Sequence, residues 1–429
     1  MPTHICRAAF VVLACLVTAC GGGGSSSTTP PVGVNAQGNA THTRDDWPMY
    51  AHDAHHTSAS SASLSGPLQA SWRYNPQAIS GDTFSTVDNA IATVTGVYVH
   101  WEQYGATVFA GGPSFDGISP AGQGLWTYCE HRDYDEGHWS SVFSGAFVFE
   151  DDGQQFLNLN TGVPMKTPAK KWSTGYDLWG ESIADTSGLY SVNTFLADGA
   201  DLFVYSLDAS GGTRWTQNQQ KSTKYSQDQA GGLVLAGGVL FYAPNYSDPS
   251  PFASGVYALS AATGTRLAYV STLPTSELSA DGQNIYLIEN SSKLTARAQS
   301  DLHVVWSTTV TSTSPSPPVL AAGLVIVATT NGIEAHAASS GKLVWTAAVT
   351  VASGSGYSTA MAAALGSNTL LVTAWDGLHL LRLSNGSPVW HGTVAGAGTL
   401  VDPVIVNDPA RGPTVYVTDG RGVIALVPG

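Results

Sequence analysis

Histidines and carboxylates gather in one stretch near the start of the sequence, where they could bind a metal or carry protons. Residues 45–60 read DDWPMYAHDAHHTSAS and contain His52, Asp53, His55 and His56. Neighbouring histidines point in different directions, and their spacing does not match the ligand spacings of zinc sites. We therefore expect the three histidines to lie at the surface without a metal.

A second polar cluster, CEHRDYDEGHW, spans residues 129–139. Its Asp133, Asp135 and Glu136 are weak candidates for a metal site, and calcium is the cation that their carboxylates would suit. The spacing matches neither the twelve-residue calcium loop nor the HExxH zinc helix. The sequence therefore predicts a solvated acidic loop and no catalytic residue here.

Signatures of other enzyme classes are absent from the sequence. It has no Gly-x-Ser-x-Gly elbow, no phosphate-binding P-loop and no Cys-x-x-Cys-His haem motif. Of its four cysteines, Cys129 alone lies beyond residue 20, so we expect a buried and inert thiol there. The formal net charge of −14 also excludes a nucleic-acid partner, which requires a basic surface.

The N-terminus has the pattern of an export signal. A start carrying Arg7 leads into the apolar run AAFVVLACLV, which is too short to span a bilayer as a helix. The run ends in Val17-Thr18-Ala19 before Cys20, which resembles a bacterial lipobox. This resemblance implies a signal peptide over residues 1–19 and acylation of Cys20. Residues 20–44 then form a flexible tether to the membrane, with the outer membrane facing the periplasm as the expected location.

The remaining residues, 45–429, are dominated by a degenerate repeat of strands. Stretches such as GIEAHAASSGKLVW and GLHLLRLSNGSPVW share an alternating strand, a turn with Gly and a short strand that ends in an aromatic residue. The aromatic residues recur at intervals of 37 to 54 residues: Trp72, Trp126, Trp172, Trp215, Tyr269, Trp306, Trp345 and Trp390. This period predicts an all-β propeller of four-stranded antiparallel blades, in which these aromatics pack between blades.

The two ends of the repeat indicate how the ring closes. After Trp390 the sequence holds only three further strands, so LQASWRYN at 68–75 is expected to supply the missing fourth strand. The count is then eight blades, with seven as the fallback. The Asn331-Gly332 and Asp376-Gly377 pairs predict two-residue hairpin turns. Residues 45–60 become the lead-in to this closing strand, anchored by Trp47, Pro48 and Tyr50, with turn hydrogen bonds from Asp53 and Thr57.

Together the repeats resemble the PQQ-like β-propeller family. The resemblance rests on Ala258-Leu259, Thr263-Gly264 and Trp345 of the repeat and on the lead-in Trp47-Pro48-Met49-Tyr50. The pattern departs from the family at Tyr269, where Trp is expected, and at Leu302, where the turn glycine is expected. The family includes quinoprotein dehydrogenases and BamB-like lipoproteins that serve outer-membrane protein assembly without catalysis.

The resemblance implies an adjacent cysteine pair for alcohol-oxidising members, and this sequence has none. We therefore expect a non-catalytic, lipid-anchored scaffold that binds a cell-envelope protein and needs no cofactor. The contact loops would be residues 111–123, 129–139 and 244–253. One alternative is a sugar or alcohol oxidoreductase that uses PQQ with calcium, and a second is an extracytoplasmic polymer- or sugar-binding module.

Overall fold

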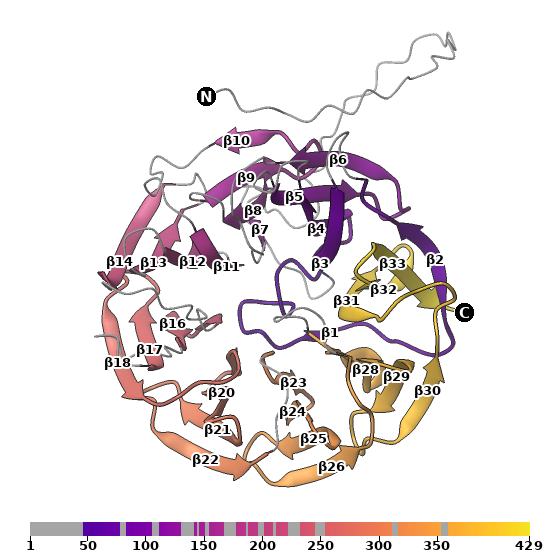
Figure 1. Ribbon diagram of the computed structural model, residues 1–429. Coiled ribbons are helices and arrows are strands. Elements are labelled where there is room, and N and C mark those ends of the chain that lie inside the picture. Colours follow the sequence, from indigo (N-terminus) through magenta and orange to yellow (C-terminus); the bar gives the residue numbers. More distant parts are fainter. Residues whose placement is uncertain are drawn as a thin grey trace, which may run out of the picture.

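The strands of this protein are arranged as a closed ring (Figure 1). The computed structural model describes residues 46–77, 83–104, 111–129, 141–143, 146–150, 154–166, 177–185, 188–195, 201–208, 212–221, 232–244, 254–310, 316–352 and 359–429. Within these ranges the only helical element is the 3-10 turn η1 (Leu365–Ser367). The prediction of an all-β propeller built from four-stranded antiparallel blades is confirmed.

Eight sheets are formed by the described strands, and each runs from an innermost strand near the ring centre to an outermost strand at the rim (Figure 1). The first four are β3 (Thr83–Thr93), β4 (Gly96–Tyr104), β5 (Gly111–Ile118) and β6 (Gly124–Cys129); β7 (Ser141–Phe143), β8 (Ala146–Glu150), β9 (Gln154–Asn158) and β10 (Pro164–Lys166); β11 (Asp177–Asp185), β12 (Gly188–Phe195), β13 (Asp201–Leu207) and β14 (Thr213–Lys221); and β15 (Leu233–Ala236), β16 (Val239–Tyr242), β17 (Gly255–Ser260) and β18 (Arg266–Ser271).

The other four sheets follow the same order. They are β19 (Ser279–Ala280), β20 (Asn284–Glu289), β21 (Lys293–Ala298) and β22 (Val304–Thr309); β23 (Val319–Ala321), β24 (Leu324–Thr329), β25 (Gly332–Ala337) and β26 (Leu343–Ala347); β27 (Met361–Ala364), β28 (Thr369–Ala374), β29 (Gly377–Arg382) and β30 (Pro388–Gly392), with the short β1 (Ala59–Ser60) added to β27; and β31 (Val401–Asp408), β32 (Gly412–Thr418), β33 (Val423–Pro428) and β2 (Leu68–Tyr74).

Residue type follows the position of a strand within its sheet. The second strand β24 has the sequence LVIVAT and is buried along its whole length, because both faces of the sheet pack against neighbouring sheets. The outermost strand β26 has the sequence LVWTA and buries only its tryptophan. An apolar run therefore marks a strand inside the ring, and a single large aromatic residue marks a strand at the rim.

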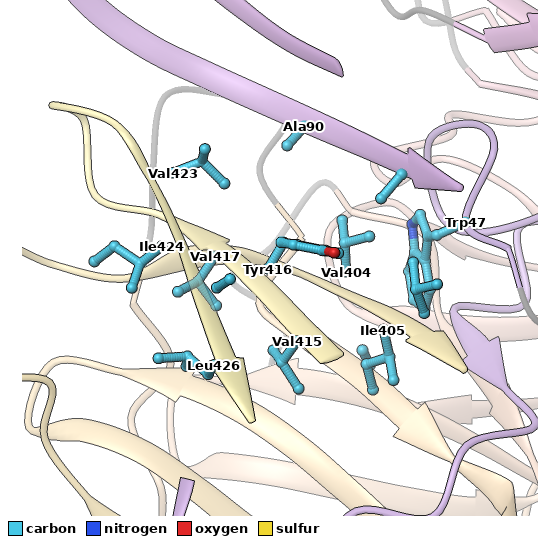
Figure 2. Close-up of a cluster of buried hydrophobic side chains, with 14 of the residues drawn as sticks. Trp47, Ala90, Val404, Ile405, Val415, Tyr416, Val417, Val423, Ile424 and Leu426 are labelled. Carbon is cyan, nitrogen blue, oxygen red and sulfur yellow. The ribbon is translucent and has the colours of Figure 1, made fainter. Parts of the chain in front are cut away.

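The ring closes between the two ends of the repeat, as predicted. Strand β2 pairs antiparallel with β33, from Leu68 opposite Pro428 to Tyr74 opposite Val423. The hydrophobic cluster at this closure includes Val415 and Leu426 and is shown in Figure 2. Pairing with β2 covers β33 on its outer side, so β2 becomes the outermost strand of the closing sheet.

The hairpin turns differ from the prediction by one residue. Thr329 pairs with Gly332, so the two residues of that turn are Thr330 and Asn331, and Gly332 begins the next strand. Gly332 has a φ of +122°, and a Cβ atom there would lie 2.1 Å from the carbonyl oxygen of Ala347. The glycine is thus required by the close approach of a neighbouring strand as well as by the turn.

Candidate functional site at the ring centre

The ring centre is crossed by the chain's own N-terminal residues 46–64, which we call the central segment (Figure 1). Its backbone carbonyls accept hydrogen bonds from the innermost strands of five sheets. Pro48 accepts from Val142 of β7, Ala54 from Leu235 of β15, His55 from Ala280 of β19, Thr57 from Leu320 of β23 and Ser58 from Ala363 of β27, at 2.7 to 2.9 Å. The segment thereby satisfies backbone donors that would otherwise face the axis of the ring.

Both ends of the central segment are fixed in the same way. Trp47 forms a two-way backbone bridge with Ala92 of β3, with N···O distances of 2.7 and 2.8 Å. Its indole is 2% exposed and lies beside Val404 of β31 in Figure 2. At the other end, Ala59 and Ser60 pair in parallel with β27. Trp47, Pro48 and Tyr50 are all buried, which confirms them as structural anchors.

Asp53 organises the turn at the middle of the segment. Its Oδ1 accepts hydrogen bonds from the backbone N–H groups of His55 (3.0 Å) and Thr57 (3.1 Å), and its Oδ2 accepts from the Thr57 hydroxyl (2.7 Å). The predicted turn hydrogen bonds are therefore present. Burial acts to raise the pKa of Asp53, but hydrogen bonds from His52 and Thr57 outweigh it and hold that pKa well below its usual range.

The prediction that all three histidines lie at the surface is wrong for two of them. His55 is exposed, but His52 is 7% exposed and His56 is fully buried. Their rings pack edge-on against aromatic neighbours, His52 against Trp47 at 4.8 Å and His56 against Tyr50 at 5.6 Å. The reason is that the segment lies inside the ring, where the surrounding sheets cover side chains that a surface lead-in would expose.

Four non-glycine residues of the central segment adopt positive φ, namely Ala51 (+50°), His52 (+83°), His56 (+53°) and Ser58 (+50°). Left-handed backbone conformations are unfavourable for such residues and persist only where the surroundings impose them. Here the hydrogen bonds to the innermost strands fix the path of the chain. The segment is thus shaped by the ring around it.

Replacement of Asp53 by Ala should destabilise the protein by about 2 to 3 kcal/mol, because two backbone donors and one hydroxyl lose a charged acceptor. The depressed pKa makes this contribution present above about pH 4, and it is lost as the pH falls further. Urea denaturation at pH 7 measures the effect. Asp301→Ala, which removes a carboxylate from an exposed turn, is the matched control and should leave the midpoint nearly unchanged. Equal midpoints for the two variants would contradict the role given to Asp53.

Seven of the predicted packing aromatics are described and lie on outermost strands, and five of them contact the next sheet in the ring. Each of these five indole N–H groups donates to a backbone carbonyl of that sheet at 2.6 to 3.0 Å: Trp72 to Pro120, Trp126 to Leu159, Trp215 to Ala261, Trp306 to Ala338 and Trp345 to Leu383. Each indole also lies against a turn glycine of positive φ, in the same order Gly122, Gly162, Gly264, Gly341 and Gly386. Trp390 instead lies against Gly66, and Trp172 falls outside the described residues.

Tyr269 and Leu302, the two positions that depart from the repeat pattern, also differ in their contacts. The hydroxyl of Tyr269 donates to Ser254, within its own sheet. The turn of the following sheet then has Leu302 where the others have glycine, and Leu302 keeps the left-handed φ of +64°. A tyrosine at the rim thus coincides with a buried leucine in the next turn.

Of the other predicted sites, only the contact loop at 111–123 lies within the described residues over its whole length. Residues 111–118 form strand β5, so the contact loop predicted at 111–123 is wrong over most of its length. The turn that follows holds Gly122 beneath Trp72, which is a packing role. Asp133, Asp135 and Glu136 lie outside the described residues, as do Cys20 and residues 245–253.

One buried carboxylate lies where the ring closes. Asp116 of β5 is 1% exposed and accepts a hydrogen bond of 3.0 Å from the hydroxyl of Tyr74 on the closing strand β2. Burial raises the pKa of Asp116 to about 6, and hydrogen bonds that favour the charged form oppose this only in part. The pair joins two neighbouring sheets, and neither residue lines the two cavities beside the central segment.

Asp116→Asn should therefore stabilise the protein above pH 7 by up to about 3 kcal/mol. A carboxyl whose folded-state pKa is raised from 3.8 to about 6 makes the native state lose stability as the pH rises through this window. The amide keeps an acceptor for Tyr74 and removes the charge. Thermal or urea denaturation of both proteins should show a difference at pH 8 that disappears near pH 4, and a difference independent of pH would contradict the assignment.

Residues 252–427 match the model of a PQQ-like family described as “Outer membrane protein assembly factor BamB”. The match covers β17 to β33, where the repeat is most regular. No curated protein matches the chain.

Solved structures share the propeller fold over most of the chain. The quinohemoprotein alcohol dehydrogenase of Comamonas testosteroni aligns at 12% identity and a TM-score of 0.64, covering 90% of this chain and 81% of the other. BamB of Moraxella catarrhalis aligns at 13% and 0.53, covering 85% and 98%. The computationally designed Ika8 protein aligns at 10% and 0.53, covering 83% and 99%. Identities this low establish the fold alone, which an enzyme, an assembly factor and a designed protein share.

Proposed function

We propose that this protein is a non-catalytic cell-envelope lipoprotein whose propeller is a protein-binding scaffold, with a role in outer-membrane protein assembly of the BamB type. In this proposal each of the eight sheets is one blade. The family match and the BamB-like fold support it. The observation that carries it is the central segment, which occupies the axis of the ring and is hydrogen-bonded to the innermost strands. Because the central segment fills the ring centre, a partner would bind at the outer surface of the propeller.

The ring centre does not fit a quinone cofactor. PQQ with calcium needs a flat cavity, stacking groups and carboxylates that hold the cation. The two cavities beside the central segment have only about 20 and 10 Å³ of space for water, enough for about one molecule each. The larger one is lined mainly by Ala, Val, Pro, Ile and Met side chains. The small size and apolar lining of these two cavities support the scaffold over the alternative oxidoreductase.

A better candidate for partner contact is an apolar belt on the outermost strands. It consists of Leu267 on β18, Val304 and Val305 on β22, Leu343 and Val344 on β26, and Val389 on β30, all at least 40% exposed. In the described part of the ring, β18, β22, β26 and β30 each pair with a strand on one side only. Exposed apolar side chains on free strand edges favour binding of an extended segment of another protein.

The decisive experiment is crosslinking in intact cells followed by purification of this protein. We expect envelope proteins of outer-membrane assembly to co-purify, and the Val305→Asp/Val344→Asp double variant to lose them. The matched control is Ser307→Asp/Thr346→Asp, which places the same charges at exposed polar positions of the same strands. Equal recovery with both variants would remove the belt from the proposal. Saturable binding of PQQ with calcium and dye-linked substrate oxidation would overturn the scaffold function itself.

The membrane anchor is a separate element of the proposal. Residues 1–19 are the signal peptide, Cys20 carries the lipid, residues 20–44 form the tether and 45–429 the propeller. Among the described residues, no helix is long and apolar enough to cross a bilayer. Cys20→Ser should move the protein out of the membrane fraction, because the acyl chains that hold it there can no longer be attached. Membrane fractionation checks this, and retention of the variant in the membrane would contradict acylation at Cys20.

A further inference from the structure

Two histidines and an aspartate meet on the sheet of β27 to β30, outside the ring centre. His379 of β29 and His391 of β30 lie directly opposite each other in the antiparallel ladder. Asp376 lies in the two-residue turn between β28 and β29. Each residue offers one ligand atom, and the three atoms lie within 4.8 Å of one another.

Both imidazoles face Asp376. Nε2 of His379 lies 2.8 Å from Oδ1 of Asp376, and Nε2 of His391 lies 3.2 Å from the backbone carbonyl oxygen of Asp376 and 3.6 Å from its Oδ2. The two rings are stacked, with centroids 4.2 Å apart and planes at 26°. Ligands of a tetrahedral zinc ion at its usual bond lengths are separated by about 3.3 Å, which small movements of these side chains reach.

The backbone around the cluster makes this approach possible. Gly377 has a φ of +129°, and a Cβ atom there would lie 2.4 Å from the carbonyl oxygen of Gly392. The turn that carries Asp376 is thus pressed against the end of β30, next to His391. Because His379 and His391 lie on paired strands, they are held in register by the sheet instead of a loop.

We propose that Asp376, His379 and His391 form a binding site for a divalent transition metal, with Zn²⁺ as the expected ion. Two imidazoles and one carboxylate suit zinc and similar ions, whereas calcium and magnesium require oxygen ligands. The side chain of His379 is 14% exposed, while those of His391 and Asp376 are 47% and 65% exposed. The ion would therefore have three protein ligands and a fourth position open to water or to an anionic group. This site is independent of the proposed scaffold function.

The test is zinc titration of the full chain, purified without a polyhistidine tag, by calorimetry. We expect saturable binding of one ion at this site, and at least tenfold weaker binding for His391→Ala, His379→Ala and Asp376→Asn. Cobalt should give the visible absorption of a tetrahedral complex with the wild type and lose it with the variants. Magnesium should not compete, because it prefers oxygen ligands.

The matched control is His303→Ala. His303 also contacts an aspartate, Asp301, in an exposed turn, but that pair has no third ligand within the described residues. The zinc affinity of His303→Ala should equal that of the wild type. His391 is more exposed than His379, so His391→Ala should still fold and test the site if His379→Ala does not. Absent saturable binding, or binding that survives both histidine substitutions, would overturn the proposal.

Discussion

Arg297→Met should destabilise the protein by about 3 to 5 kcal/mol, because it leaves the Glu289 carboxylate buried without its cation. The guanidinium Nε and Nη2 both lie 2.8 Å from Oε1 of Glu289, and the two side chains are 8% and 4% exposed. Oε2 accepts a further hydrogen bond of 3.0 Å from the Thr295 hydroxyl. If the arginine charge is removed, the Glu289 carboxylate stays buried without a cation, and its desolvation is no longer compensated.

The same arginine supports the turn that departs from the repeat. Its Nη1 donates a hydrogen bond of 2.8 Å to the carbonyl of Leu302, whose φ is +64°. We expect the double variant Glu289→Leu/Arg297→Met to recover part of the lost stability, since no charge is then left buried. Urea denaturation at pH 7 measures both proteins. A double variant no more stable than Arg297→Met alone would contradict this explanation.

The matched control for this pair is Arg421→Met. Arg421 contacts Asp419 at 3.3 Å, and its own side chain is 60% exposed. The buried Asp419 carboxylate keeps two hydrogen bonds of 2.8 Å from Arg73, so loss of Arg421 leaves it paired and should cost less than about 1 kcal/mol. A loss at Arg421 as large as that at Arg297 would show that burial is not the cause. The comparison separates the cost of an unpaired buried charge from the loss of an arginine side chain as such.

The propeller could be predicted from sequence because its repeat is set by simple physical requirements. A fully apolar strand such as Leu324–Thr329 must lie between two packed faces, and Trp345 at a fixed distance from a turn glycine marks the rim. The closing strand followed from counting, because only three strands remain after Trp390. These signals are local in sequence, and they recur in one sheet after another around the ring.

The ring centre could not be predicted in this way. The string around His52 and His56 has polar composition, so local rules place it at the surface. Its burial depends on backbone hydrogen bonds to strands as distant in sequence as Ala363, and no spacing in the sequence encodes those partners. Backbone carbonyls carry these contacts, and every residue type has one.

The cluster of Asp376, His379 and His391 was missed for a related reason. In sequence the two histidines are twelve residues apart and fit no metal motif. They become neighbours only through the register of β29 with β30. A signal was available, because two strands joined by a short turn place residues at equal distances from that turn opposite each other. A search for histidines in mirrored positions of predicted hairpins would have found them.

The contact between Trp345 and Gly386 should be the strongest test of how neighbouring sheets are joined. Trp345 is 6% exposed and donates a hydrogen bond of 2.6 Å to Leu383 of the next sheet. Trp345→Ala should cost about 3 to 5 kcal/mol, since it leaves a cavity and an unpaired carbonyl. Gly386→Ala should cost about 2 to 4 kcal/mol, since the residue has a φ of +69° and the new Cβ would lie 2.6 Å from the indole.

A double-variant cycle separates the two costs of Gly386→Ala, which are the backbone strain at positive φ and the clash with the Trp345 indole. With alanine at position 345 the clash is gone, so Gly386→Ala should then cost only the backbone strain of about 1 to 2 kcal/mol. Gly323→Ala is the matched control, because Gly323 has a φ of +76° and no atom within 4 Å of a Cβ placed there. Its cost should equal that of Gly386→Ala in the Trp345→Ala background. Additive effects in the cycle, measured by urea denaturation with unchanged slopes, would mean that indole and glycine do not act as a pair.

Among the described residues, both partners of this pairing differ at Tyr269 and Leu302. Where Tyr269 replaces tryptophan, the next turn tolerates a leucine at positive φ, so the left-handed turn is kept after the indole is lost. Leu302→Gly should relieve backbone strain of about 1 to 2 kcal/mol but lose a side chain that is 1% exposed, which costs more. We therefore expect net destabilisation there, opposite to what the repeat pattern alone suggests. If Leu302→Gly instead stabilises the protein in urea denaturation, the turn is limited by backbone strain, and the packing of Leu302 contributes little.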